Sequence, residues 1–245
     1  MSDTSCISPR SLVAEFIGTM GLIIAAIGSI ILTTVVWGAT DMPFVFVFIN
    51  AIAVAFILFA LIETFGPLSG AHFNPAVTVA FTMSGECAPK KAVCYIAAQL
   101  SGALFGVLLL GIFFFEHLSG LFVVSEIPRS EISLILSEFF CAFMLVAIIF
   151  GCVRGGSNKT SLAVGLFVGG MILATASTMF ANPAVSIARI FTETACGIAP
   201  LSALYFAMAN IAGAVAAAIL FGWLYPKKPK EETCETTVLN ADNKA

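Results

Sequence analysis

The chain has 245 residues, of which 60% are hydrophobic and 10% are charged, and its formal net charge is −3. Soluble domains usually carry about a quarter charged residues, so this composition excludes an ordinary soluble domain and indicates an integral membrane protein. The charges are thinly spread and form no basic block, which argues against nucleic acid as a partner.

Six long stretches contain no Asp, Glu, Lys or Arg, and they predict six spanning helices, because about 20 apolar residues cross a bilayer. The charge-free stretches are 16–40, 42–62, 92–115, 139–153, 160–188 and 194–226. The predicted helices are 11–37, 43–65, 91–115, 131–153, 161–178 and 201–224. The first stretch is too long for a signal peptide and lacks its flanking signals, so we expect it to be retained. Glycine pairs with GxxxG spacing, Gly102/Gly106 and Gly165/Gly169, are predicted to let helices approach closely.

The loops between these stretches alternate in charge. The basic residues of one side are Arg10, Lys90, Lys91, Arg154, Lys159, Lys227, Lys228 and Lys230. The acidic residues that fall largely on the other side are Asp41, Glu116, Glu126, Glu131 and Glu193. By the positive-inside rule both termini are expected in the cytoplasm. We expect 1–10 to be a short cytoplasmic N-terminus and the polar tail 225–245 to be cytoplasmic and disordered.

Cysteine and histidine give no sign of a metal site or of an enzyme. The seven cysteines show neither a CxxC pair nor metal-ligand spacing, and most fall in or beside apolar stretches, so we expect small core residues. His72 and His117 are the only histidines, and no pair of nucleophile and base stands at a suitable spacing. We therefore expect no cofactor, no metal and no catalytic residue.

Three landmarks occur twice in the same order, which indicates a duplication. The pairs are Ala14-Glu15-Phe16 with Ser137-Glu138-Phe139, Asn74-Pro75-Ala76-Val77 with Asn182-Pro183-Ala184-Val185, and Gln99-Leu100-Ser101-Gly102-Ala103 with Asn210-Ile211-Ala212-Gly213-Ala214. The predicted repeats are 11–125 and 126–224. Because three helices separate the copies, the second enters the membrane from the opposite face. The result is an inverted repeat with its functional site at the midplane.

Each Asn-Pro-Ala motif opens a stretch that is too short to span a bilayer, 74–84 in the first repeat and 182–191 in the second. Asn is a good helix N-cap, and Pro is favoured at the first helical position because its missing N–H is not needed there. The motifs therefore predict two half-helices that start at mid-depth. Two such starts from opposite faces place two positive helix ends, each worth about +0.5 charge, at the bilayer centre, where they oppose cations and protons.

The segments that lead into the half-helices, 66–73 and 179–181, are expected to be unwound. Non-helical backbone at this depth is tolerated only where it lines a wet cavity. A file of water is expected to accept hydrogen bonds from the amides of Asn74 and Asn182 and to donate to the exposed carbonyls. The sequence thus predicts an all-α membrane protein with six transmembrane helices and two re-entrant half-helices.

Over residues 11–224 several motifs resemble the signatures of the aquaporin, or major intrinsic protein, family. They are Ala14-Glu15-Phe16-Ile17-Gly18-Thr19, Ser69-Gly70-Ala71-His72-Phe73-Asn74-Pro75-Ala76-Val77-Thr78 and Ala98-Gln99-Leu100-Ser101-Gly102. The resemblance implies a homotetramer in the lipid of the plasma (inner) membrane, with a pore in each protomer. It also implies that Glu15 and Glu138 accept backbone N–H bonds from the re-entrant loops and that His72 lines the pore. The alternatives are a proton relay through the two carboxylates and a packed loop histidine.

The outer constriction departs from the family pattern. Water-selective members have Arg three residues after the second Asn, whereas this chain has Val185. Arg189, seven residues after Asn182, would lie on a helix about 20° from the direction of that Asn and about 10 Å nearer the outer mouth. Its guanidinium is expected either to reach back toward the constriction or to pair with Glu193 at i+4.

The other constriction positions are predicted to be Val54 from the second helix, one of Gly169, Gly170 and Ile172 from the fifth, and Met179 from the loop. Together with Val185 they indicate a broader and more apolar constriction than water selectivity requires. The glycerol-conducting branch has Asp soon after the second motif, where this chain has Ser186. The Phe-Ala-Asn-Pro-Ala-Val-x-x-Ala-Arg pattern of residues 180–189 looks more like that of a prokaryotic subgroup with Val in the filter. Some members of this subgroup are linked to uncharged metalloid acids such as arsenite.

The leading hypothesis is a passive channel for water and small uncharged solutes, such as glycerol or metalloid acids, that excludes protons and ions. A secondary transporter is the alternative, because inverted repeats and broken helices also occur in that class. Such a transporter requires ionisable groups at the midplane, for which Glu15 and Glu138 are the only candidates.

Overall fold

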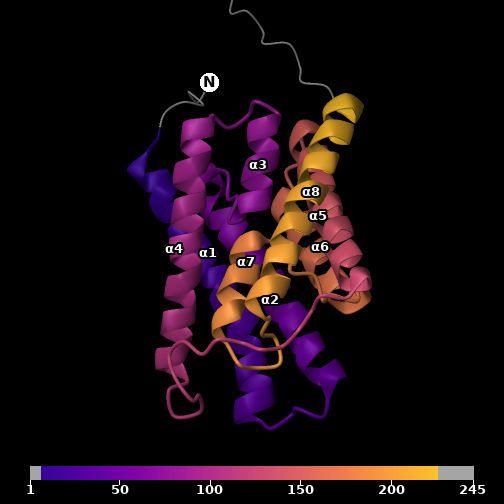
Figure 1. Cartoon of the computed structure of the whole chain (residues 1–245). Coiled ribbons are helices and arrows are strands. Elements are labelled where there is room, and N and C mark those ends of the chain that lie inside the picture. The colour runs from indigo at the N-terminus through magenta and orange to yellow at the C-terminus, as the bar shows by residue number, and fades with distance from the viewer. Residues whose placement is uncertain (1–6, 226–245) are drawn as a thin grey trace, which may run out of the picture.

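The computed structural model describes residues 7–225, and each regular element within this range is a helix (Figure 1). The elements are α1 (Pro9–Ile30), continued by the π-helical turn η1 (Ile31–Val36), α2 (Pro43–Ser69), α3 (Pro75–Met83), α4 (Pro89–Phe113), α5 (Ile132–Arg154), α6 (Thr160–Ala174), α7 (Pro183–Ala188), continued by the 3-10 turn η2 (Arg189–Phe191), and α8 (Pro200–Leu224). The predicted tail, apart from Tyr225, and most of the predicted N-terminal segment lie outside the described residues, as do Cys6 and Cys234.

Within the described range, five helices are long and apolar enough to cross a bilayer, namely α1 with η1, α2, α4, α5 and α8. α6 is apolar but has only 15 residues, about 22 Å of helix, so the predicted extension to residue 178 is wrong. α6 ends at Ala174 because Thr175 takes up extended backbone (φ −116°, ψ 149°) and opens the segment that leads to α7. The all-α architecture otherwise follows the prediction, with α3 and α7 as the half-helices.

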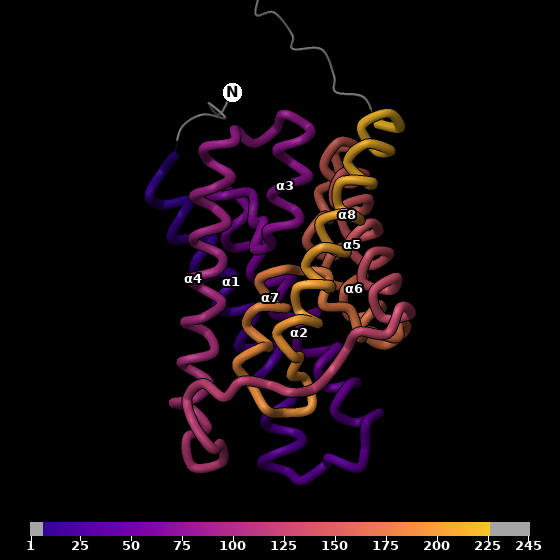
Figure 2. Tube along the Cα trace, viewed as in Figure 1, coloured from indigo at the N-terminus to yellow at the C-terminus, as the bar shows by residue number. Residues whose placement is uncertain are grey.

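The two halves repeat the same packing in opposite orientations. α1 lies along α4 in the first half and α5 lies along α8 in the second, while α2 packs against α6 across the halves. Figure 2 shows α3 and α7 entering the bundle from opposite ends and meeting near its middle. Both described ends of the chain lie at one end of the bundle (Figure 1). We call this the terminal end and the opposite one the outer end.

Glycine lets the paired helices touch. A Cβ on Gly102 of α4 would lie 2.2 Å from the carbonyl oxygen of Phe16, and a Cβ on Gly213 of α8 would lie 2.2 Å from that of Phe139. Side-chain carbons do not approach backbone so closely, so only glycine fits at these two equivalent sites. Gly165 does the same for α6, where a Cβ would lie 2.8 Å from a carbonyl oxygen of α2. The predicted close approach of helices at Gly102 and Gly165 is confirmed, and Gly213 adds a site that was not predicted.

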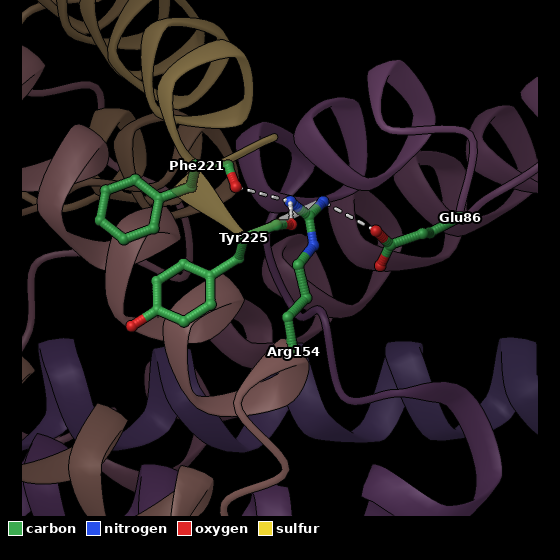
Figure 3. Close-up of polar contacts among 4 residues, drawn as sticks. All are labelled: Glu86, Arg154, Phe221 and Tyr225. Atoms are coloured by element: carbon green, nitrogen blue, oxygen red, sulfur yellow. Dashed lines mark hydrogen bonds and ion pairs between the residues drawn. The ribbon is translucent and has the colours of Figure 1, made fainter. Parts of the chain in front are cut away.

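Arg154, the last residue of α5, joins three elements at the terminal end (Figure 3). Its Nη2 lies 2.7 Å from Oε1 of Glu86, in the turn after α3, and its Nη1 donates to the carbonyl oxygens of Phe221 (3.0 Å) and Tyr225 (3.3 Å). Its Cζ lies 4.0 Å from the centre of the Phe150 ring. A cation is favourable at the C-terminus of α8, where unpaired carbonyls carry partial negative charge. Arg154 therefore ties the far end of half-helix α3 to α5 and α8.

We expect Gly102→Ala and Gly213→Ala each to lower the thermal unfolding midpoint of the purified protein by roughly 5–10 °C, because the added methyl group meets backbone of the neighbouring helix. Gly222→Ala in α8 is the matched control and should leave the midpoint unchanged, since a Cβ there meets nothing within 4 Å. Equal midpoints for the Gly102 and Gly222 variants would contradict this packing.

Candidate functional site

The first re-entrant segment is shorter than predicted. α2 continues through Gly66 and Pro67 to Ser69 and ends at Gly70, whose φ of 89° is left-handed and whose N–H donates to the Gly66 carbonyl at 2.9 Å. The expected unwinding from residue 66 is therefore wrong, because a glycine C-cap closes the helix four residues later. The non-helical segment before α3 is residues 70–74.

Both re-entrant segments hold ordinary residues in left-handed backbone conformations. The residues with positive φ besides glycine are Ala71 (51°), Phe73 (48°), Thr178 (57°), Met179 (46°) and Ala181 (46°). Each such residue costs of order 1 kcal/mol and persists only where its surroundings hold it. The segments therefore need anchors, which two buried carboxylates supply.

Glu15 of α1 anchors the first segment. Its Oε1 accepts hydrogen bonds from Ser69 Oγ (2.6 Å) and from the backbone N–H of His72 (3.0 Å). Its Oε2 accepts from the backbone N–H of Phe73 (2.7 Å) and from Gln99 Nε2 (2.7 Å). The side chain is fully buried and does not line the central cavity described below.

Glu138 of α5 has the equivalent position in the second half. Its two oxygens accept from the backbone N–H groups of Phe180 (2.8 Å) and Ala181 (2.7 Å), and Asn210 Nδ2 donates to Oε2 at 2.8 Å. Asn210 thus takes the place that Gln99 has in the first half, as the sequence repeat predicted. This side chain is also fully buried away from the cavity. Both carboxylates have the geometry that loop support requires.

The two Asn-Pro-Ala motifs are crossed over one another. Asn74 and Asn182 are the N-caps of α3 and α7, and each side-chain oxygen accepts the N–H of the alanine two residues on, at 2.8 and 2.9 Å. Asn74 Nδ2 donates to the carbonyl of Ala181 (2.8 Å), and Asn182 Nδ2 donates to that of Phe73 (2.9 Å). An amide carries two N–H donors, so each asparagine keeps one for a molecule at the meeting point of the half-helices.

A cavity runs along the bundle past this meeting point. It is lined from both halves by the re-entrant segments, by the two asparagines and by apolar side chains of α1, α2, α5 and α6. Of the residues predicted to contact solute, those lining the cavity are Val54, His72, Asn74, Ile172, Met179, Asn182, Val185 and Arg189. The N-terminal ends of α3 and α7 and the two asparagine side chains therefore meet at this cavity.

Of the three candidates predicted for the α6 position of the constriction, neither Gly169 nor Gly170 lines the cavity. Gly170 is exposed on the outward face of α6, where a Cβ would meet nothing within 4 Å. Gly169 packs against α2, where a Cβ would lie 2.9 Å from that of Ala55. Ile172 is the residue of this turn that lines the cavity. Gly170 was predicted wrongly because the helical phase of α6 could not be fixed without its point of contact with α2.

Hydrogen bonding fixes the ring of His72. Gln99 Nε2 donates to Glu15 and also to Thr78 Oγ1 (3.0 Å), and the Thr78 hydroxyl donates to the Asn74 carbonyl (3.0 Å). His72 Nδ1 lies 3.1 Å from Thr78 Oγ1, so a hydrogen bond between these two side chains orients the imidazole ring.

Ser186, which stands where the glycerol-conducting branch has Asp, is the counterpart of Thr78. Its hydroxyl donates to the Asn182 carbonyl at 3.2 Å, and its side chain is fully buried outside the cavity lining. The Ser186 side chain therefore contacts the start of α7 and does not line the cavity.

Arg189 lies beyond the end of α7 but reaches the cavity. Its side chain is only 4% exposed, and its Nη2 donates to the carbonyl of Ala26 in α1 at 3.3 Å. Glu193, the alternative partner, accepts instead from the hydroxyl of Ser119, and the ion pair found among residues 7–225 is that of Arg154. The guanidinium also lies over the ring of Phe180, with 4.0 Å between Cζ and the ring centre.

Phe180 was not predicted as a site residue, although it too lines the cavity. Its place two residues before Asn182 was visible in the sequence. Its contact with Arg189 was not, because that contact depends on the turn of chain between Asn182 and η2.

Taken together, an inverted bundle, two half-helices meeting at crossed asparagines and a cavity past them define a membrane channel. Residues 3–179 match the model of the family described as "Major intrinsic protein", so the chain belongs to that family. It is therefore a passive channel for water and small uncharged solutes and not an enzyme.

The proteins similar to this chain include two curated relatives and one solved structure. The aquaglyceroporin AqpS of Rhizobium meliloti (strain 1021) is 39% identical, over 90% of this chain and 92% of that protein. The aquaporin NIP1-1 of Zea mays is 30% identical, over 93% of this chain and 79% of that protein. The aquaglyceroporin of Plasmodium falciparum has the same fold, with a TM-score of 0.65 at 19% identity, over 88% of this chain and 94% of that one.

We expect Glu15→Gln and Glu138→Gln to reduce the yield of folded protein and its thermal stability more than they change the ratio of solute to water permeability. Each substitution turns an acceptor into an amide that faces N–H donors, and charge-assisted hydrogen bonds are worth about 1.5–3 kcal/mol each. Glu116→Gln, at an exposed site after α4, is the control and should behave as the unaltered protein. Normal stability with transport abolished would support a proton relay instead.

Proposed function

We propose that the outer part of the pore admits uncharged solutes larger than water, glycerol and small neutral metalloid acids among them. The observation that carries the proposal is the nature of the four side chains at this level of the cavity. Val54, Ile172, Met179 and Val185 are all apolar and all line it. A water molecule that passes an apolar wall loses hydrogen bonds to other water molecules and gains none from the wall. The carbon skeleton of a polyol, in contrast, packs favourably against such a wall.

The cation of the constriction is supplied by Arg189 rather than by a residue at position 185. Its guanidinium offers fixed donors to the oxygen atoms of a passing solute, opposite the apolar wall. The similarity to AqpS, a protein named as an aquaglyceroporin, supports a preference for polyols over water alone.

We also propose that the channel excludes protons and cations. The support lies in the N-termini of α3 and α7, which meet at the midplane with partial positive charge. Asn74 and Asn182 each direct a remaining N–H donor to this point, so a water molecule there accepts two bonds and is not free to relay a proton along the file. A secondary transporter is disfavoured, because Glu15 and Glu138 each accept several hydrogen bonds and lie away from the cavity.

In the membrane, we propose a homotetramer in the plasma (inner) membrane with both termini in the cytoplasm. The long helices carry large apolar side chains on their outward faces, for example Phe56 of α2, Leu166 of α6 and Trp223 of α8. Lipid and neighbouring protomers are the partners that such faces require. The loop charges of the sequence favour the terminal end as the cytoplasmic one.

We expect proteoliposomes of the purified protein to conduct water rapidly while their proton permeability stays at the level of protein-free liposomes. Stopped-flow light scattering measures the first and a pH-sensitive dye inside the vesicles measures the second, under an imposed pH gradient. A proton flux that rises with the amount of channel, in step with water permeability, would overturn proton exclusion.

We expect Val185→Arg to lower glycerol permeability by about tenfold, equivalent to about 1.4 kcal/mol of barrier, while water permeability changes little. The new side chain fills volume at the constriction and adds a second fixed cation near Arg189. Val185→Ile, which adds one methylene and no charge, is the matched control and should lower glycerol permeability much less. An unaltered protein that passes only water would contradict the wide constriction at the outset.

A further inference from the structure

The guanidinium of Arg189 is buried, and no carboxylate among residues 7–225 forms an ion pair with it. The one hydrogen bond recorded for this side chain in the described part of the chain is to the Ala26 carbonyl, at a long 3.3 Å. Its Nε is buried without a hydrogen-bond partner. One long hydrogen bond does not fix the plane of a guanidinium that has five N–H donors. Something else must hold it at the cavity wall.

The ring of Phe180 is placed to do so. Cζ of Arg189 lies 4.0 Å from the ring centre, a contact at which a guanidinium and an aromatic face attract one another. Both side chains are nearly fully buried and both line the cavity. Water is largely excluded at such a contact, so the attraction is stronger than on a protein surface.

The ring is itself held from several sides. The Phe180 N–H donates to Glu138, and Phe206 of α8 meets the ring edge-on, with 5.2 Å between ring centres. Arg129, from the segment between α4 and α5, lies with Cζ 5.6 Å from the ring centre. Its guanidinium is fixed in turn, by hydrogen bonds to the carbonyls of Gly197 (3.0 Å) and Ala195 (2.9 Å). A ring confined in this way is a rigid platform.

We propose that Phe180 is a positioning residue that determines solute specificity, because its ring face holds the guanidinium of Arg189 across the outer pore. A cation that stands four residues beyond Val185 thereby acts at the level of the constriction. This inference rests on the proposed function and adds to it the residue that sets the upper size of the solute. A solute passes if it has oxygen acceptors and a cross-section no larger than the gap beside the guanidinium. Longer and bulkier polyols do not pass.

The test is a double-mutant cycle on selectivity in proteoliposomes, with the ratio of erythritol to water permeability as the readout. We expect Arg189→Ala to raise this ratio by about fivefold when Phe180 is present, because it removes the held guanidinium. Phe180→Met keeps a large apolar side chain without an aromatic face. Phe180→Met alone is expected to raise the ratio of erythritol to water permeability. In the Phe180→Met background, Arg189→Ala should change this ratio by less than about twofold. Phe180→Leu repeats the cycle if the Phe180→Met variant folds poorly.

Phe180→Tyr retains the ring and should keep the ratio of the unaltered protein. A ring that served only as a wall would give the same effect of Arg189→Ala in the unaltered and the Phe180→Met backgrounds, and that additivity would overturn the inference while leaving the wide constriction intact. Failure of the proposed function is read separately, from the unaltered protein alone: if it conducts water but no glycerol, the proposed function and this inference fail together.

Discussion

The structure depends on two buried carboxylates that hold strained backbone. Glu15 and Glu138 each accept two consecutive backbone N–H groups of a segment that crosses left-handed conformations. Without these acceptors the N–H groups would be unpaired in a region with no bulk water, at a cost of several kcal/mol each. The carboxylates make an otherwise unfavourable chain path the stable one, and every cavity-lining backbone group follows from that path.

The two carboxylates also explain the symmetry between the two halves of the chain, and that symmetry does not extend to the ends of the pore. Glu15 with Gln99 and Glu138 with Asn210 give both halves one scaffold, and the crossed bonds of the asparagines lock the halves to each other. Outside this scaffold the halves differ. Toward the terminal end, the imidazole of His72 lines the cavity and is hydrogen-bonded to Thr78. Toward the outer end, the guanidinium of Arg189 lies against the ring of Phe180. A shared architecture at the midplane therefore coexists with different chemistry at the two ends of the pore.

The features that could be predicted from the sequence are those that depend on short-range sequence patterns. Apolar stretches located the helices, and Asn-Pro pairs located the starts of α3 and α7, because N-cap and first-turn preferences act within a few residues. The duplication identified Asn210 as the counterpart of Gln99. Two predictions about α6 were wrong. The helix ends early because the backbone becomes extended at Thr175, and Gly170 points outward because Gly165 and Gly169 form the contact with α2.

Contacts between segments that lie far apart in the chain could not be predicted from the sequence. The alternatives for Arg189 stayed open because Glu193 is its neighbour on an ideal helix, whereas the chain leaves α-helical geometry at Arg189 itself. Phe180 is nine residues from Arg189 and on the other side of a half-helix, so no periodicity links them. The contact of Arg129 with the Phe180 ring was even less predictable, because Arg129 reaches the site from the non-helical segment between α4 and α5.

Amide hydrogen exchange, followed by mass spectrometry on the purified protein, tests the central role of the carboxylates most directly. Peptides covering residues 71–74 and 179–182 should exchange as slowly as the buried spans of α1 and α5, although both segments are non-helical and face a wet cavity. Exchange there as fast as in the exposed loop 116–122 would mean that Glu15 and Glu138 do not hold these segments, and the account would be wrong at its foundation.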